Sequence, residues 1–294
     1  MNVGVGENRP PKLSGYKLTE KRYQSRHSGI YRAVRESDQQ CVALKCLNKE
    51  YPNAVDISRL ESEHRLLEQL ALPGLLTSYG VERSYNTPVL VLENFNGQPL
   101  SSSYISPPIP LPLFFKIAHQ VVSVLQQMEQ QGVVHHNIHP GNLLWNGETE
   151  ELRLSGIWAC TSPTGGVGFP FNPTTDFNLS SISPEQTGRM NQGVDSRTSF
   201  YSLGVTFYYL LSGCYPHEAE DTPGWIHSHI AKIPVNPCEH NPDVPALLGQ
   251  LILKLMAKSP DDRYQTMAGL LQDLSRCEQA WLQTGEVASF SLGQ

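Results

Sequence analysis

The chain has 294 residues, with 22 Lys+Arg against 28 Asp+Glu and a net charge of -6. That length can bury a core without disulfides or metals. The acidic balance and the lack of a basic stripe argue against nucleic-acid binding. The six dispersed cysteines form no C-x-x-C and are typical of reduced thiols in a cytoplasmic protein. No signal-peptide pattern begins the chain, and the apolar run at 204–211 is too short to cross a membrane.

The first third of the chain predicts a sheet with one helix. Residues 1–15 are polar and rich in Gly and Pro, which predicts disorder. From residue 16 onward, short apolar segments alternate with polar turns. Leucines about one turn apart predict an amphipathic helix over 58–70. Clear strands are expected at 29–34, 41–46, 76–82 and 88–93. Together with the β-like stretch that begins at residue 16, these give five strands and one helix in a small N-terminal lobe, residues 16–95.

Residues 96–282 predict a larger, mainly helical lobe. Apolar residues at spacings of three and four predict a helix from Leu113 to Met128. Two short apolar runs flank the turn Asn146-Gly147, and an irregular segment of a length that is usually functional follows at 161–183. Further helices are expected at 199–212, 222–230, 245–257 and 266–281. Residues 283–294 carry no capping signals and predict a linker.

Two charged residues stand out in the N-terminal part. Lys45 ends the strand segment Val42-Ala43-Leu44-Lys45, in which Ala43 and Lys45 face one side and Val42 and Leu44 the other. Glu63 lies in the middle of the expected helix. Taken alone, the two residues fit an ordinary surface ion pair equally well.

The segment His135-His136-Asn137-Ile138-His139-Pro140-Gly141-Asn142 concentrates polar groups in the C-terminal part. One interpretation is a metal site built from the three histidines, since His-x₃-His is a ligand spacing on a helix. However, Pro140-Gly141 predicts a loop, and no nearby cysteine or carboxylate completes a ligand set.

The order and spacing of these segments resemble the protein kinase signature: V-A-I-K, a helix glutamate, H-R-D-L-x-x-x-N and D-F-G. In that register Asn137 replaces the aspartate that accepts the substrate hydroxyl proton. Gly156, or Ser155 one residue earlier, replaces the aspartate that binds Mg²⁺. The sequence contains no aspartate between Asn137 and Asp176. Asn142, the other usual metal ligand, remains.

Further motifs of the resemblance are degraded. The family's glycine loop maps onto residues 23–30, where Tyr23, Ser25 and Ser28 take the glycine positions and would obstruct phosphates. His136 stands in for the arginine that reads a phosphorylated loop, and His139 for the lysine that steadies the transferred phosphate.

Other motifs are structural. Ser183-Pro184-Glu185 resembles A-P-E, and Arg263 resembles its buried arginine partner. Ser199 stands where the family has an aspartate that holds the catalytic loop, so a third acidic position is lost.

Over residues 16–282 the chain resembles bacterial Ser/Thr kinases. Residues 181–191 are similar to the kinase-like domain of hybrid proteins that also carry a histidine kinase. The resemblance implies an α+β, two-lobed fold with an adenine pocket between the lobes. Residues expected to sandwich the base are Ile30, Ala43 and Leu144, and the backbone of Glu93 and Phe95 is expected to meet its edge.

The missing acids predict a pseudokinase, a signalling module that acts through binding. Weak ATP binding is expected through Lys45 and Glu63, without Mg²⁺. The expected partners are other signalling proteins or modules of a larger hybrid kinase, not nucleic acid or membrane. Two alternatives stay open: an unconventional Ser/Thr kinase using Lys45, Glu63 and Asn142, and a nucleotide sensor that binds ATP without turnover.

Overall fold

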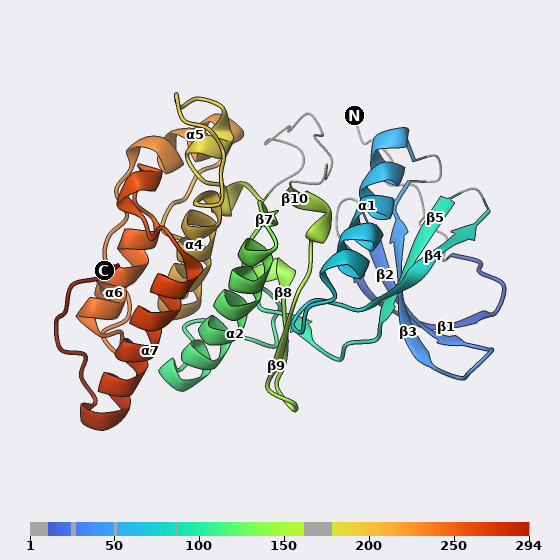
Figure 1. Cartoon of the computed structure of the whole chain (residues 1–294), viewed down its shortest axis with the longest axis horizontal. Helices are drawn as coiled ribbons and strands as arrows, with labels where there is room; N and C mark the ends of the chain where they lie inside the picture. Colours follow the sequence, from blue (N-terminus) through green and yellow to red (C-terminus); the bar gives the residue numbers. More distant parts are fainter. Residues whose placement is uncertain (1–10, 25–27, 50–51, 86, 162–177, 294) are drawn as a thin grey trace. The chain divides into compact units, whose positions relative to one another are not determined.

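The computed structural model describes residues 11–24, 28–49, 52–85, 87–161 and 178–293 (Figure 1). The chain divides into two compact units. The N-terminal unit comprises Met1–Ala71 and Leu75–Asn96, and the C-terminal unit comprises Leu72–Gly74 and Gly97–Gln294. The predicted lobe boundary at residue 95 lies next to the last of these junctions.

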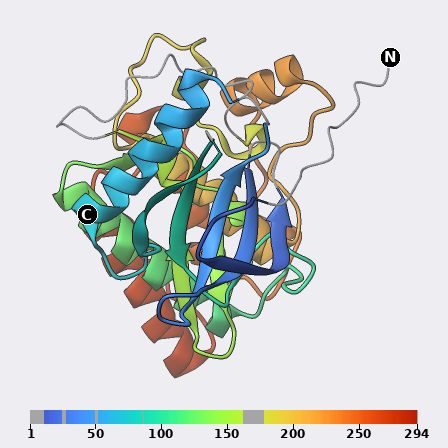
Figure 2. The same cartoon turned by 90° about the vertical axis from the view of Figure 1, so that its right-hand side faces the viewer.

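The N-terminal unit is a five-stranded antiparallel sheet in the order β1-β2-β3-β5-β4, with one helix, α1, packed against it (Figures 1 and 2). The expected five strands and one helix are therefore confirmed. Their bounds are β1 Tyr16–Gln24, β2 Ser28–Arg35, β3 Cys41–Leu47, α1 Ala54–Leu70, β4 Ser78–Ser84 and β5 Thr87–Glu93.

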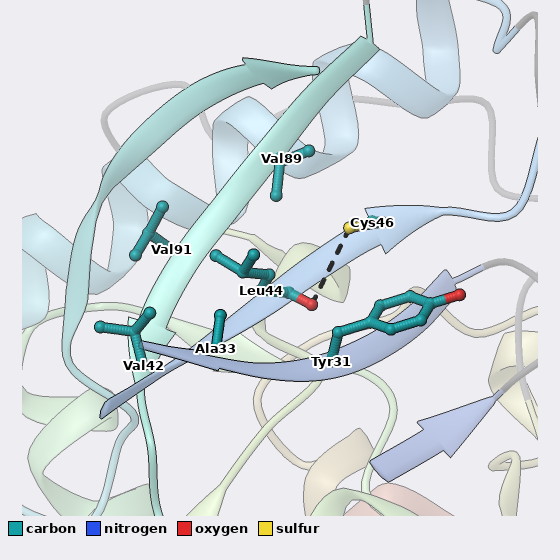
Figure 3. Packing of buried hydrophobic residues seen from close by; sticks show 7 residues of the cluster. All are labelled: Tyr31, Ala33, Val42, Leu44, Cys46, Val89 and Val91. Carbon is teal, nitrogen blue, oxygen red and sulfur yellow. Dashed lines mark hydrogen bonds between the residues drawn. The ribbon is translucent and has the colours of Figure 1, made fainter. Parts of the chain in front are cut away.

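Alternation along the strands places a hydrophobic cluster on one face of this sheet. Figure 3 shows its members Tyr31, Ala33, Val42, Leu44, Cys46, Val89 and Val91. Val42 and Leu44 belong to it, so Ala43 and Lys45 of the same strand face the other side. Leu13, Tyr16 and Leu18 pack against the cluster.

Two boundaries of the N-terminal unit differ from the sequence prediction. The helix α1 begins at Ala54, earlier than expected, because the side chain of Asn53 caps it by accepting a hydrogen bond from Asp56 N. Residues 1–10 lie outside the described part of the chain. Lys12, however, was expected to be disordered, and its backbone exchanges two hydrogen bonds of 3.1 Å with the hydroxyl of Ser84.

The C-terminal unit is mainly helical, as predicted. Its main helices are α2 Leu111–Gln130, α4 Thr198–Ser212, α5 Thr222–Ala231, α6 Ala246–Leu255 and α7 Met267–Thr284. Helix α4 is central, since nearly all of its residues are buried. A Cβ added at Gly204 would lie 2.7 Å from Met256 and 2.8 Å from Leu255, so this glycine allows α4 to approach α6 closely. Within the described residues, no helix is long and apolar enough to cross a membrane.

Short strands organise the site region of this unit. Strand β8 (Leu143–Asn146) pairs with β9 (Glu151–Leu154) and with β6 (Gln98–Pro99). Strand β7 (Val134–His135) pairs with β10 (Cys160–Thr161). A 3₁₀ turn, Pro140–Asn142, joins β7 to β8. The sequence suggested β8 and β9 through their apolar runs but gave no signal for the two-residue strands.

The segment after α7 lies against that helix. The Arg276 guanidinium lies 3.8 Å from the centroid of the Phe290 ring, and Gly293 N donates to Asp273 Oδ2 at 2.7 Å. Asp273 is buried and also accepts from the Tyr264 hydroxyl at 2.8 Å. Residues that were predicted as a linker therefore complete the hydrogen bonding of a buried carboxylate.

Candidate functional site

In the N-terminal unit, Lys45 and Glu63 form a close ion pair. Lys45 Nζ donates to both carboxylate oxygens of Glu63, at 2.6 and 2.8 Å. The Lys45 side chain is 15% exposed and that of Glu63 only 4%. The pair joins β3 to the middle of α1 and is largely shielded from water. The ordinary surface ion pair considered from the sequence does not describe it.

The residues expected to hold a base in this unit lie around Lys45. Ile30 on β2 stands directly opposite Lys45 on β3, and Ala43 lies two residues along the same strand. Because opposed residues of antiparallel strands share a face, all three lie on one face of the sheet. Glu93 ends β5, and the carbonyl of Phe95 just beyond it accepts a hydrogen bond from Arg22 Nη1 at 3.2 Å. The role of Arg22 was not foreseen from the sequence.

The expected phosphate-covering loop is described only at its ends. Tyr23 lies in β1, opposite Ile30, with 47% of its surface exposed. Ser28 begins β2, and Ser25 lies outside the described residues. At two of the three glycine positions of the family pattern, the structure therefore has side-chain-bearing residues in strands.

In the C-terminal unit, the segment that should carry the catalytic aspartate, residues 135–137, is held by neutral side chains. Three successive backbone carbonyls each accept a hydrogen bond from a side chain of another segment. The three pairs are Ser199 Oγ to His135 O at 3.1 Å, Gln186 Nε2 to His136 O at 2.8 Å, and Asn142 Nδ2 to Asn137 O at 2.9 Å. No charged group takes part in these three bonds.

The histidines of this segment are also neutral, structural groups. Burial lowers the pKa of His135, His136 and His139 to about 4. His135 Nδ1 accepts from Asn137 N at 3.2 Å, so its proton is on Nε2, which donates to Ser155 O at 3.0 Å. His139 Nδ1 accepts from Gly141 N at 3.1 Å. With both nitrogens of His135 engaged, the three-histidine metal site that was weighed and disfavoured from the sequence has no support.

Asn137 and Asn142 are fixed within the same network. Asn137 is buried, and its Oδ1 lies 3.5 Å from Asn178 N. Asn142 O accepts from both the backbone N–H and the hydroxyl of Ser155, at 2.8 and 3.0 Å. Asn142 thus connects Asn137 to Ser155, the residue that precedes Gly156.

Gly156 occupies a position that resists a side chain. Its φ is +81°, and a Cβ added there would lie 2.4 Å from Asn142 Nδ2. Neither Gly156 nor Ser155 offers the carboxylate that a Mg²⁺ ion prefers. The Asn142 amide already donates to Asn137 O. The residues present do not fit a magnesium site of the kinase type.

The expected pair of Glu185 and Arg263 is confirmed. Arg263 donates to both carboxylate oxygens, at 2.7 and 2.9 Å, and both side chains are fully buried. Thr198 Oγ1 donates to the same carboxylate at 2.9 Å. Arg263 also donates to the carbonyls of Ala257 and Arg197. This bidentate pair is therefore fully hydrogen-bonded, as buried charges require.

A second group of buried histidines was not foreseen from the sequence. His229 Nε2 donates to Leu179 O at 2.8 Å, and its Nδ1 lies 3.0 Å from the Tyr201 hydroxyl. The ring of His217 lies edge-on to that of His229, with centroids 5.4 Å apart. Burial, with a smaller contribution from the charge of Lys258, lowers the pKa of His217 to about 3 and that of His229 to about 4.

Leu144, the remaining residue expected to contact a base, lies on β8 of the C-terminal unit and pairs with Arg153 and Pro99. The predicted site residues thus fall into two sets. Lys45, Glu63, Ile30, Ala43, Glu93 and Phe95 lie in the N-terminal unit, and Asn137, Asn142, Leu144 and Gly156 lie in the C-terminal unit.

Comparison with known proteins places these features in a family. The protein kinase domain model matches residues 24–274, most of the chain. The sequence is 50% identical to Hybrid signal transduction histidine kinase G of Dictyostelium discoideum over 93 residues. The matched stretch covers 32% of this chain and 3% of that protein. It is 27% identical to Serine/threonine-protein kinase Pkn1 of Myxococcus xanthus, over 77% of this chain and 33% of that protein.

A probable serine/threonine-protein kinase of Clostridium acetobutylicum is 24% identical over 92% of this chain and 41% of its own length. The chain therefore spans less than half the length of these relatives. The antiparallel sheet with one helix and the helical C-terminal unit agree with the predicted α+β kinase fold. The chain belongs to the protein kinase family and is related to the bacterial Ser/Thr kinases.

Proposed function

We propose that this chain is a pseudokinase, a kinase-fold signalling module with impaired phosphotransfer. The observation that carries the proposal is the loss of both acids in the C-terminal unit. Asn137 cannot take up a proton, and a general base contributes typically ~10²–10⁴ in rate. Gly156 supplies no metal ligand, and its positive φ and contact with Asn142 disfavour any side chain there.

A second candidate is an active but unconventional Ser/Thr kinase. The formed Lys45–Glu63 pair favours it, because active kinases need this pair in place. The relatives named as serine/threonine-protein kinases favour it as well. Such an enzyme would have to position the substrate hydroxyl with Asn137 and to neutralise phosphate charge without the usual metal ligand.

Nucleotide binding is part of the proposal. In the N-terminal unit, Lys45 offers the positive charge for ATP phosphates, and Ile30 and Ala43 offer an apolar face. Without a fitting Mg²⁺ site, binding would be weak and little changed by divalent metal. As for partners, we propose other signalling proteins or modules of a larger protein, since the chain covers less than half the length of the relatives compared above.

The test is incorporation of labelled phosphate from ATP, by the chain itself and into generic substrates. We expect wild type to match Lys45→Met. Lys49→Met is the control, because Lys49 lies just beyond β3 and its exposed side chain pairs with Asp56 instead of Glu63. Lys45-dependent incorporation near the ~1–100 s⁻¹ of ordinary kinases would overturn the pseudokinase and establish the second candidate.

A further inference from the structure

A charged cluster lies on the face of the N-terminal sheet that carries Ile30 and Ala43. Glu20 stands opposite Arg32, and Arg32 stands opposite Ala43, across three neighbouring strands. Opposed residues of antiparallel strands share a face. The Glu20 carboxylate lies 3.4 Å from Arg22 Nε and 3.7 Å from Arg32 Nη1. Arg22 therefore belongs to the face on which a base is expected to stack.

Arg22 reaches from this cluster to the backbone beyond β5. Its Nη1 donates to Phe95 O at 3.2 Å, and its Nη2 donates to Asn96 Oδ1 at 2.9 Å. The side chain is only 17% exposed. In β1, Lys21 pairs with Tyr31 and Tyr23 pairs with Ile30, so the register shifts at Arg22. Such a bulge re-aims the side chain it contains, which accounts for the direction Arg22 takes.

We propose that Arg22 is a specificity-determining residue that disfavours adenine at the base-contact edge of the N-terminal unit. The proposal rests on the proposed function, in which Ile30 and Ala43 face the base and the backbone of Glu93 and Phe95 meets its edge. Adenine brings an amino donor to such an edge and needs a carbonyl acceptor there. The guanidinium of Arg22 occupies the Phe95 carbonyl, so this acceptor is already engaged.

The same geometry indicates which ligand edge suits the site. A guanidinium has five N–H donors and no acceptor, so it matches a base edge that carries a carbonyl oxygen, as guanine does. Its hydrogen bonds are charge-assisted and stronger than those between neutral groups. An adenine ring must therefore displace a strong contact, whereas the carbonyl oxygen of guanine does not compete for the Phe95 carbonyl.

Nucleoside binding to the whole chain tests this directly. Adenosine and guanosine carry no phosphate, so neither Lys45 nor a metal ion contributes to their affinity. We expect Arg22→Leu to bind adenosine roughly tenfold more tightly than wild type, the order of one charge-assisted hydrogen bond, without a gain for guanosine. Titration calorimetry gives both affinities. Arg35→Leu is the matched control, since Arg35 pairs with Asp38 at the other end of β2.

An adenosine affinity of Arg22→Leu within about twofold of wild type would overturn the inference, and so would the absence of binding by both proteins. An equal gain for guanosine would also overturn it, because Arg22 would then obstruct every base alike. Arg22→Lys keeps the charge but loses the fork that spans two acceptors, so we expect an intermediate adenosine affinity. This variant supplies the test if Arg22→Leu does not fold. Lys45-dependent phosphotransfer would overturn the pseudokinase and leave these nucleoside affinities to decide the role of Arg22.

Discussion

The two units hold their candidate site residues by different means. In the N-terminal unit an ion pair, Lys45–Glu63, fixes the site lysine at 2.6–2.8 Å from its partner. In the C-terminal unit the segment from His135 to Asn137 is held by a hydroxyl and two amides. The only fully buried ion pair described there, Glu185–Arg263, serves the architecture of the unit.

The neighbours of Asn137, Gly156 and Ser199 accommodate these neutral residues. The backbone carbonyls of His135, His136 and Asn137 each accept a hydrogen bond, and Asn142 lies against Gly156. The C-terminal unit therefore holds this segment through neutral hydrogen bonds, whereas the N-terminal unit holds Lys45 through an ion pair.

The largest effect expected from this contrast is acid sensitivity of the C-terminal unit. Burial lowers the pKa of His135, His136, His139, His217 and His229 from 6.5 to about 4 or below. Below pH 6.5 the unfolded chain binds protons that the folded chain does not, so stability falls as the pH falls. Each histidine contributes about 1.4 kcal/mol per pH unit, so five histidines over 1.5 pH units give a loss on the order of 10 kcal/mol by about pH 5.

Tryptophan fluorescence during urea unfolding measures this loss, because Trp145, Trp158, Trp225 and Trp281 all lie in the C-terminal unit. A variant, His217→Phe, removes one titrating group and should flatten the pH dependence by about one proton. Stability that is constant between pH 6.5 and about 5 would contradict the neutral histidine network.

The next largest effect concerns the buried ion pair. Glu185→Gln leaves the Arg263 cation buried without its counter-charge, and we expect a loss of about 3–5 kcal/mol in unfolding free energy. Asp195→Asn, which weakens the partly exposed pair with Arg197, should cost about 0–1 kcal/mol. Urea denaturation compares the two variants. Equal costs would show that burial does not distinguish these pairs.

Restoring the lost acids should cost stability rather than return activity. Gly156→Asp places a side chain at φ +81° and against Asn142, and we expect a loss of about 1–3 kcal/mol. Gly193→Ala is the control, since no atom beyond its chain neighbours lies within 4 Å of the added Cβ. The double variant with Asn137→Asp should show no phosphotransfer above Lys45→Met. Substantial turnover in that assay would mean that the rest of the site is intact.

The smallest effect tests the polarity of a single hydrogen bond. Ser199 donates to His135 O, so Ser199→Ala should cost about 1 kcal/mol. Ser199→Asp restores the residue type of the family but turns an acceptor toward that carbonyl, and it should be less stable than the alanine variant. Thermal unfolding ranks them, with Thr206→Val of the same helix as control. An aspartate variant as stable as wild type would show that the loop returns to the family arrangement.

The sequence predicted those features that depend on local periodicity or on motifs. Apolar spacing gave the helices and most strands, and motif positions gave Lys45–Glu63 and Glu185–Arg263 as pairs. The neutral network could not be predicted, because Ser199 and Gln186 bond to residues 64 and 50 positions away. Arg22 was missed because a bulge, which has no periodic signal, sets its direction.

The placement of Leu72–Gly74 constrains where one unit could be replaced without disturbing the other. These residues follow α1 but belong to the C-terminal unit, where Gly74 O accepts from Leu154 N at 2.7 Å. An added Cβ at Gly74 would lie 2.2 Å from the Val124 side chain, so the backbone of Gly74 packs directly against Val124 and leaves no room for a side chain. If the chain were divided only after Asn96, Leu72–Gly74 would be separated from the C-terminal residues that they contact. Recombination that swaps one unit for another must therefore match the junctions on both sides of this short insert as well as the one after Asn96.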